Sequence, residues 1–196
     1  MTRLIWVAAF YAVATSIAPA ARAVPIVFEA TLNGATEVPP NASPGTGFAE
    51  VDFDPVADTM HVHVTFSGLE AGTTASHIHC CTPSPLAGAV GVATTVPTFP
   101  GFPLGVTAGV YDQTFDLALP STYNPAFVTA HGGAVAGAEA ALFAGLLGEE
   151  AYLNIHTTEF PGGEIEGFLI RVPEPSTLAL LGCGLSGLGL FRRKRA

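Results

Sequence analysis

The chain has 196 residues and an acidic composition, with seven Lys and Arg against sixteen Asp and Glu and a formal net charge of −9. An acidic surface repels nucleic acid and anionic lipid, so a nucleic-acid-binding function is excluded. The length suits one domain with a buried core, and no sequence repeat at solenoid spacing is visible.

The first 23 residues have the pattern of a secretory signal peptide. An apolar run over residues 4–20 follows Arg3, and Ala21 and Ala23 are the small residues of a signal peptidase site. A membrane anchor is the alternative, but polar residues and a proline interrupt the run. We therefore expect signal peptidase to cleave the chain and the folded body to begin at Val24.

The body between the two ends of the chain is more acidic than the whole. Arg171 is the only Lys or Arg between positions 24 and 172, whereas all but one of the sixteen acidic residues lie there. Such a surface attracts cations, so its partners should be neutral or basic.

Alternation of apolar and polar residues predicts strands through most of the body. Residues 47–66 read as a hairpin, in which two alternating runs flank the turn sequence DPVAD. Further strands are expected at residues 26–33, 73–79, 90–96, 109–117, 150–157 and 164–170, separated by Gly and Pro clusters. The sequence therefore predicts an all-β fold, an antiparallel β-sandwich or barrel.

Two segments depart from the strand pattern. Residues 134–149 are rich in Ala and Leu, which predicts one short helix across an end of the sandwich. Residues 83–108 are uncharged and rich in Pro and Gly, and either a disordered linker or an ordered loop has this composition. Phe99, Phe102 and Leu104 favour an ordered loop that packs against the body or docks on a surface.

Histidines on the predicted strands suggest a metal site. His77 and His79 share one side of a strand, about 6.6 Å apart along the backbone, and His156 lies on another strand. Imidazole is a common ligand of copper and zinc, and Glu164 is the candidate fourth ligand or hydrogen-bond acceptor. The alternative is that these histidines only hydrogen-bond backbone groups across the sheet. A second pair, at positions 61 and 63, is expected on a solvated face.

Cys80 and Cys81 are the only cysteines of the body, since Cys183 lies near the C-terminus. Unpaired thiols rarely persist in an oxidising compartment. A disulfide between the two neighbours, structural or redox-labile, a link to another chain, and metal ligation beside His79 all remain open.

The C-terminal end carries a second targeting segment. Val172, Pro173, Glu174 and Pro175 precede an apolar stretch and a basic terminus. A helix over residues 176–191 would rise about 24 Å, short of the ~30 Å bilayer core, and its basic end should stay in the cytoplasm. The segment resembles the PEP-CTERM sorting signal of Gram-negative bacteria. That resemblance implies transient anchoring in the inner membrane and cleavage by a protease of the exosortase type.

Three sequence blocks resemble the CHRD domain first described in chordin. They are LNGATEVPP, FSGLEAGTTASHIHC and AYLNIHTTEFPGGEIEGFL, and the resemblance runs from about Phe28 to Ile170. It implies an all-β fold in an extracellular setting, without an agreed enzymatic activity. The matching motif positions are Glu37, Val38, Pro39, Pro40, His77, Ile78, His79, Asn154, His156, Thr157, Pro161, Gly163, Glu164, Ile165 and Gly167. Cys80 and Glu166 stand where the family often has a glycine and a basic residue.

These signals predict a signal peptide (1–23), a CHRD-like β-sandwich (24–172) and a sorting segment (173–196). The sequence shows no Gly-x-Ser-x-Gly nucleophile motif. We predict a periplasmic, cell-surface or extracellular-matrix protein without catalytic activity that binds a polysaccharide or a surface protein, or acts as a structural component. The alternative function is a copper or zinc redox protein of the superoxide dismutase kind that uses the His-x-His site.

Overall fold

The computed structural model describes residues 24–173. The predicted signal peptide with Ala21 and Ala23, and the sorting segment from Glu174 onward with Pro175, lie outside the described residues. Within residues 24–173, none of the helices has both the length and the apolar character needed to cross a membrane.

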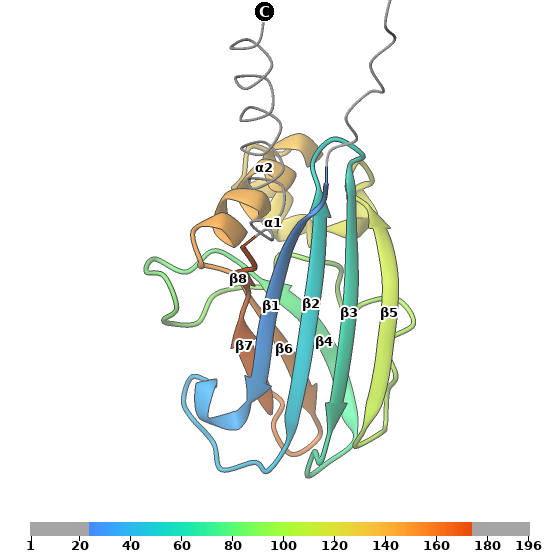
Figure 1. Ribbon diagram of the computed structural model, residues 1–196, viewed down its shortest axis with the longest axis vertical. Helices are drawn as coiled ribbons and strands as arrows, with labels where there is room; N and C mark the ends of the chain where they lie inside the picture. Colours follow the sequence, from blue (N-terminus) through green and yellow to red (C-terminus); the bar gives the residue numbers. More distant parts are fainter. Residues whose placement is uncertain (1–23, 174–196) are drawn as a thin grey trace, which may run out of the picture.

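Eight antiparallel strands form one curved sheet, a half-barrel, which confirms the predicted all-β fold. Their order is β4-β6-β7-β1-β2-β3-β5, with the short β8 beside β1. The sheet curls so that β7, β6 and β4 lie behind β1, β2, β3 and β5 (Figure 1). The strands are β1 (Ile26–Asn33), β2 (Thr46–Asp54), β3 (Thr59–Ser67), β4 (Thr73–His79), β5 (Gly109–Asp116), β6 (Tyr152–Thr157), β7 (Ile165–Phe168) and β8 (Ile170–Arg171).

The predicted hairpin of residues 47–66 is confirmed as β2 and β3. Phe53 pairs with Met60 next to the turn, and both side chains are fully buried. Asp54 holds the turn, since its Oδ1 accepts from the backbone N–H groups of Val56 and Ala57, each at 2.9 Å. Because strand side chains alternate, this pairing places every second residue of both strands in the core.

The core fills the inside of the curved sheet. Its largest fully buried side chains come from strands, from the loops and from a helix; they are Phe28, Leu32, Phe53, Met60, Ile78, Phe99, Leu117, Tyr123, Leu142, Leu146, Leu153 and Ile155. Ile78 of β4 and Leu153 and Ile155 of β6 belong to this set, so the neighbouring residues His77, His79, Asn154 and His156 face away from the core.

Two helices lie together at one end of the sheet (Figure 1). Helix α2 (Val135–Leu147) confirms the predicted helix, and Phe143 stacks on Phe53 at 4.8 Å. Helix α1 (Pro125–Ala130) was not expected, although Pro125 at its first turn and the Asn124 side chain, which accepts from Ala126 N, are recognisable start signals. The short 3-10 helices are η1 (Gly34–Thr36) and η2 (Pro120–Thr122).

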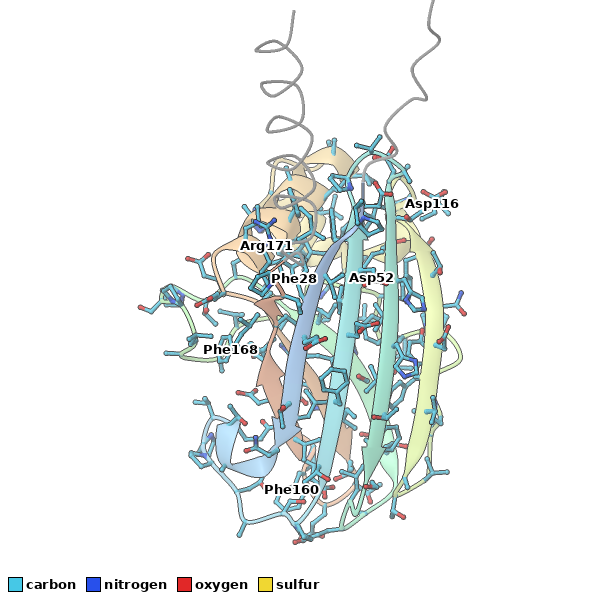
Figure 2. All side chains as sticks on the ribbon, viewed as in Figure 1. Phe28, Asp52, Asp116, Phe160, Phe168 and Arg171 are labelled. Carbon is cyan, nitrogen blue, oxygen red and sulfur yellow. A yellow bond between two sulfur atoms is a disulfide. The ribbon has the colours of Figure 1, made fainter. Side chains whose placement is uncertain are left out.

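The connection between β6 and β7 lies near the opposite end of the sheet from α1 and α2, as the position of Phe160 in Figure 2 shows.

The uncharged segment 83–108 packs against the sheet, as predicted. Phe99 is fully buried, and Phe102 stacks on Phe66 at 5.6 Å. The predicted strand at residues 90–96 is wrong, because this segment forms only isolated β-bridges, between His79 and Val92 and between Thr94 and Tyr123. The N–H groups of Ala93 and Thr94 both donate to the same acceptor, Ile78 O. Residues 90–96 therefore bend where they meet β4 and do not pair along it.

Cys80 and Cys81 form a disulfide with each other immediately after β4. The bond lies against helix α2, where Cys81 Sγ is 3.5 Å from Ala141 O. Gly145 faces it, and a methyl group at this position would overlap both sulfur atoms. The disulfide therefore requires a glycine in the facing turn of α2.

We predict that Gly145→Ala destabilises the protein. Alanine normally stabilises a helix interior by about 1 kcal/mol relative to glycine, but overpacking against the disulfide costs roughly 1–3 kcal/mol. Urea unfolding at neutral pH measures the difference. In a Cys80→Ala/Cys81→Ala background the same substitution should become neutral or stabilising, and a loss that persists there would contradict the explanation.

Candidate metal centre

Three histidines converge on the face of the sheet opposite the core. In the pairing of β4 with β6, His77 is opposite Asn154 and Ala75 is opposite His156. Because Ile78 points into the core, His77 and His79 point the other way, beside His156. One ring nitrogen from each of the three lies within 4.8 Å of the other two. The structure thus brings together the three histidines predicted from the sequence.

A backbone carbonyl orients each of the three rings. His77 Nε2 lies 2.7 Å from Pro97 O, His79 Nδ1 lies 2.8 Å from Val90 O, and His156 Nδ1 lies 3.0 Å from Pro161 O. A carbonyl oxygen can only accept, so each of these nitrogens carries the hydrogen. In a neutral ring the other nitrogen then keeps a free lone pair, which is the form that binds a metal.

The remaining nitrogens have no hydrogen-bond partner among the described residues. They are His77 Nδ1, His79 Nε2 and His156 Nε2, and all three are buried atoms. A buried polar atom without a partner costs about 1–3 kcal/mol, so three in one place call for an explanation. A shared metal ion would satisfy all three.

Burial keeps the three rings neutral at physiological pH. It lowers the pKa of His77 and of His156, against the opposing effect of their backbone hydrogen bonds. Burial also lowers the pKa of His79 to about 4, and the neighbouring histidines add to that effect. Their lone pairs are therefore available for a metal without first losing a proton.

The donor set fits copper or zinc. Nitrogens bound to one ion at about 2.0–2.1 Å lie roughly 3.4 Å apart in a tetrahedral site, so the rings need to close by a small movement. Three imidazoles leave at least one coordination position open for an outside ligand. His156 is only partly buried, and His79 is held in place by stacking on Tyr152 at 4.8 Å.

The predicted fourth ligand, Glu164, is engaged elsewhere. Its Oε1 accepts from Ser43 Oγ at 2.6 Å and from Glu70 N at 2.7 Å, so this carboxylate ties two loops together. Cys80 and Cys81 are bonded to each other, so their sulfurs are not thiolate ligands in this structure. The described residues thus supply three nitrogens to the centre.

The carboxylates beside the histidines were not predicted as a site. Asn154 Nδ2 donates to Glu37 Oε2 at 3.3 Å and to Glu166 Oε2 at 3.5 Å. Burial raises the pKa of Glu37 to about 8, with help from the charge of Glu166, and that of Glu166 to about 7. The sequence carried one signal for this group, because Asn154 shares the strand face of His156.

The second His-x-His pair takes no part in the centre. His61 and His63 each lie 3.1 Å from a carboxylate oxygen of Asp112 on β5, and Asp52 is 3.4 Å from His61. Burial would lower the pKa of His61, but the two carboxylates outweigh it and raise the pKa. This pair therefore belongs to a solvated cluster of charges, as predicted.

Comparison with known families identifies two regions of the chain. A model of the CHRD domain matches residues 28–169, and a model of the PEP-CTERM protein-sorting motif matches residues 171–195. His77, His79 and His156 all lie inside the first region. No curated protein matches the chain.

We predict that the metal-free protein loses stability on acidification through His79. Its folded pKa of about 4 lies below the ordinary histidine pKa of 6.5. The unfolded chain therefore binds more protons between these values, and the free energy of unfolding falls as pH drops through this window. The contribution of His79 from pH 7 to pH 5 is about 2 kcal/mol.

His79→Asn tests this prediction, because the Asn side chain can still donate to Val90 O. Urea unfolding of both proteins at pH 7 and pH 5, in the presence of a chelator, should show a smaller acid loss for the variant. The raised pKa values of Glu37 and Glu166 act in the opposite direction, but they are common to both proteins and cancel in the comparison. Equal acid losses would contradict the assignment.

Proposed function

Because the chain belongs to the CHRD domain family and ends in a PEP-CTERM sorting motif, we propose that it is an exported protein that binds one transition-metal ion through His77, His79 and His156. CHRD is an extracellular domain, and the PEP-CTERM motif marks secreted proteins that exosortase processes. The motif also indicates export and membrane anchoring before processing. Both family resemblances seen in the sequence are confirmed.

One observation carries the proposal: three histidines each offer a ring nitrogen within 4.8 Å of the other two, and each ring has one buried nitrogen without a partner while its other nitrogen donates to a backbone carbonyl. Such carbonyls fix the tautomer and the orientation of a ring before any ion arrives. Histidines that served only as hydrogen-bond donors would not need their second nitrogens buried together. The arrangement supports a preorganised metal site more than a purely structural cluster.

Copper and zinc are the ions that the three imidazoles favour. In the bound protein, copper would supply one-electron redox chemistry and zinc would act as a Lewis acid. The chain's own residues supply orientation, through the carbonyls of Val90, Pro97 and Pro161, and partial exclusion of water by burial. Neither CHRD nor PEP-CTERM is an enzymatic family, which fits binding better than turnover. We therefore propose metal binding outside the cell as the function.

Binding to a polysaccharide or a surface protein stays a prediction. The acidic surface and the sorting motif supported it, and an outside ligand could also reach the open position on the ion. The absence of catalysis likewise stays a prediction. The identity of the bound ion matters for it, because copper would supply redox chemistry and zinc would act as a Lewis acid.

We expect the exported full chain to contain copper or zinc at about one ion per chain, and His77→Gln/His79→Asn to lose it. These substitutions keep donors for the carbonyls of Pro97 and Val90 but remove two of the three lone pairs, so the variant should fold normally. Mass spectrometry of the purified proteins, after removal of loosely bound ions, gives the metal content, and circular dichroism gives the folding.

The matched control is His61→Gln/His63→Asn, which changes the other His-x-His pair of the same sheet. It should retain the metal in full, and so should Glu164→Gln if it folds. A wild-type chain that takes up neither ion when loaded with copper or zinc would overturn the proposal, as would equal metal loss in the two double variants.

A further inference from the structure

A second polar group lies beside the histidines on the same face of the sheet. It consists of Glu37, which follows η1, Asn154 on β6 and Glu166 on β7, and these side chains are 4%, 2% and 2% exposed. Asn154 is opposite His77 on one side and opposite Glu166 on the other. The group is therefore next to the metal centre but is made of oxygen ligands instead of nitrogens.

One oxygen atom of each of these three side chains is buried without a hydrogen-bond partner among the described residues. These atoms are Glu37 Oε1, Asn154 Oδ1 and Glu166 Oε1. The other oxygen of each carboxylate shares the single Asn154 amide group as its donor. Two buried carboxyl groups thus face one neutral donor, and Arg171, the only Lys or Arg of residues 24–173, is exposed on β8. Buried charge of this kind is ordinarily paired or bound to a metal.

The loop between β6 and β7 covers the group closely. A methyl group at Gly163 would overlap the Asn154 amide and both carboxylate oxygens of Glu37. Gly163 also has φ 139°, a conformation that favours glycine. The backbone can therefore approach these side chains, which keeps the group out of bulk water.

We propose that Glu37, Asn154 and Glu166 hold a hard divalent cation of the Ca²⁺, Mg²⁺ or Mn²⁺ class. Carboxylate and amide oxygens are the ligands that such ions prefer, whereas the three histidines prefer copper or zinc. The cation would neutralise both carboxylates and use all three free oxygen atoms. This second site is independent of the proposed function, because it shares no ligand with the histidine centre.

A shared proton is the competing explanation. With the pKa values of Glu37 and Glu166 raised to about 8 and 7, the two carboxyl groups hold at least one proton at neutral pH when no cation is present. A protonated pair would need no metal, and removal of one carboxylate charge would then simply stabilise the fold. Cation binding and proton sharing therefore differ in what an added ion does.

The test is calorimetric titration of the chelator-treated, exported full chain with Ca²⁺, Mg²⁺ and Mn²⁺ in separate experiments at pH 8. We expect one ion per chain for at least one of the three cations and a higher melting temperature with that ion. Glu37→Gln and Glu166→Gln should each weaken binding at least tenfold, and the double variant should abolish it. Gln is nearly isosteric with Glu, and circular dichroism checks that each variant folds.

Two controls locate the ion. Glu29→Gln removes a carboxylate from β1 outside the group and should leave affinity unchanged. His77→Gln/His79→Asn should also bind this cation normally, so failure of the histidine centre and failure of the oxygen site are distinguishable. Absence of binding for all three ions, or equal affinity in wild type and Glu37→Gln/Glu166→Gln, would overturn the proposal and leave the shared proton.

Discussion

The alternation of side chains in β4 and β6 is the constraint on which the site depends. Ile78, Leu153 and Ile155 are fully buried in the core, and their burial fixes which face of each strand points outward. With full burial of such a side chain worth about 1.5–3 kcal/mol, a shift of one residue in either strand would be costly. The same shift would turn His77 and His156 inward, so the energy that holds the core also sets the positions of the three histidines.

The strand pattern alone does not make a histidine pair into a site. The two His-x-His pairs of the chain have the same spacing, and both lie on strands. His61 and His63 contact the exposed carboxylate of Asp112. His77 and His79 instead donate to backbone carbonyls of a loop. The difference comes from segments that cross the strands. Residues 83–108 bring Val90 and Pro97 over β4, and the connection between β6 and β7 brings Pro161 over His156.

Periodicity explains what could be predicted from the sequence. It located β1 to β7 closely and placed His77 and His79 on one side of their strand, because strand alternation is a local property. It failed at residues 90–96, where apolar residues pack on a strand without pairing along it, and it had no means of predicting which loop would supply a carbonyl. Glu164 was the carboxylate predicted beside the histidines, whereas in the structure Glu37, far away in the chain, lies beside Asn154. Contacts between loops and strands join residues that are far apart in the chain. They depend on the whole fold and cannot be predicted from a short stretch of sequence.

The segment 83–108 also determines how this sheet can meet other proteins. β4 is at one end of the strand order, where an exposed row of backbone groups would invite a strand from another chain. Here those groups are already used: Ile78 O accepts from Ala93 and Thr94, Ser76 O accepts from Phe99, and Thr73 exchanges backbone bonds with residues 105 and 106. The histidine-bearing edge is therefore closed to β-strand addition. A secreted chain can in this way carry histidines on an edge strand among many neighbours without polymerising through that strand.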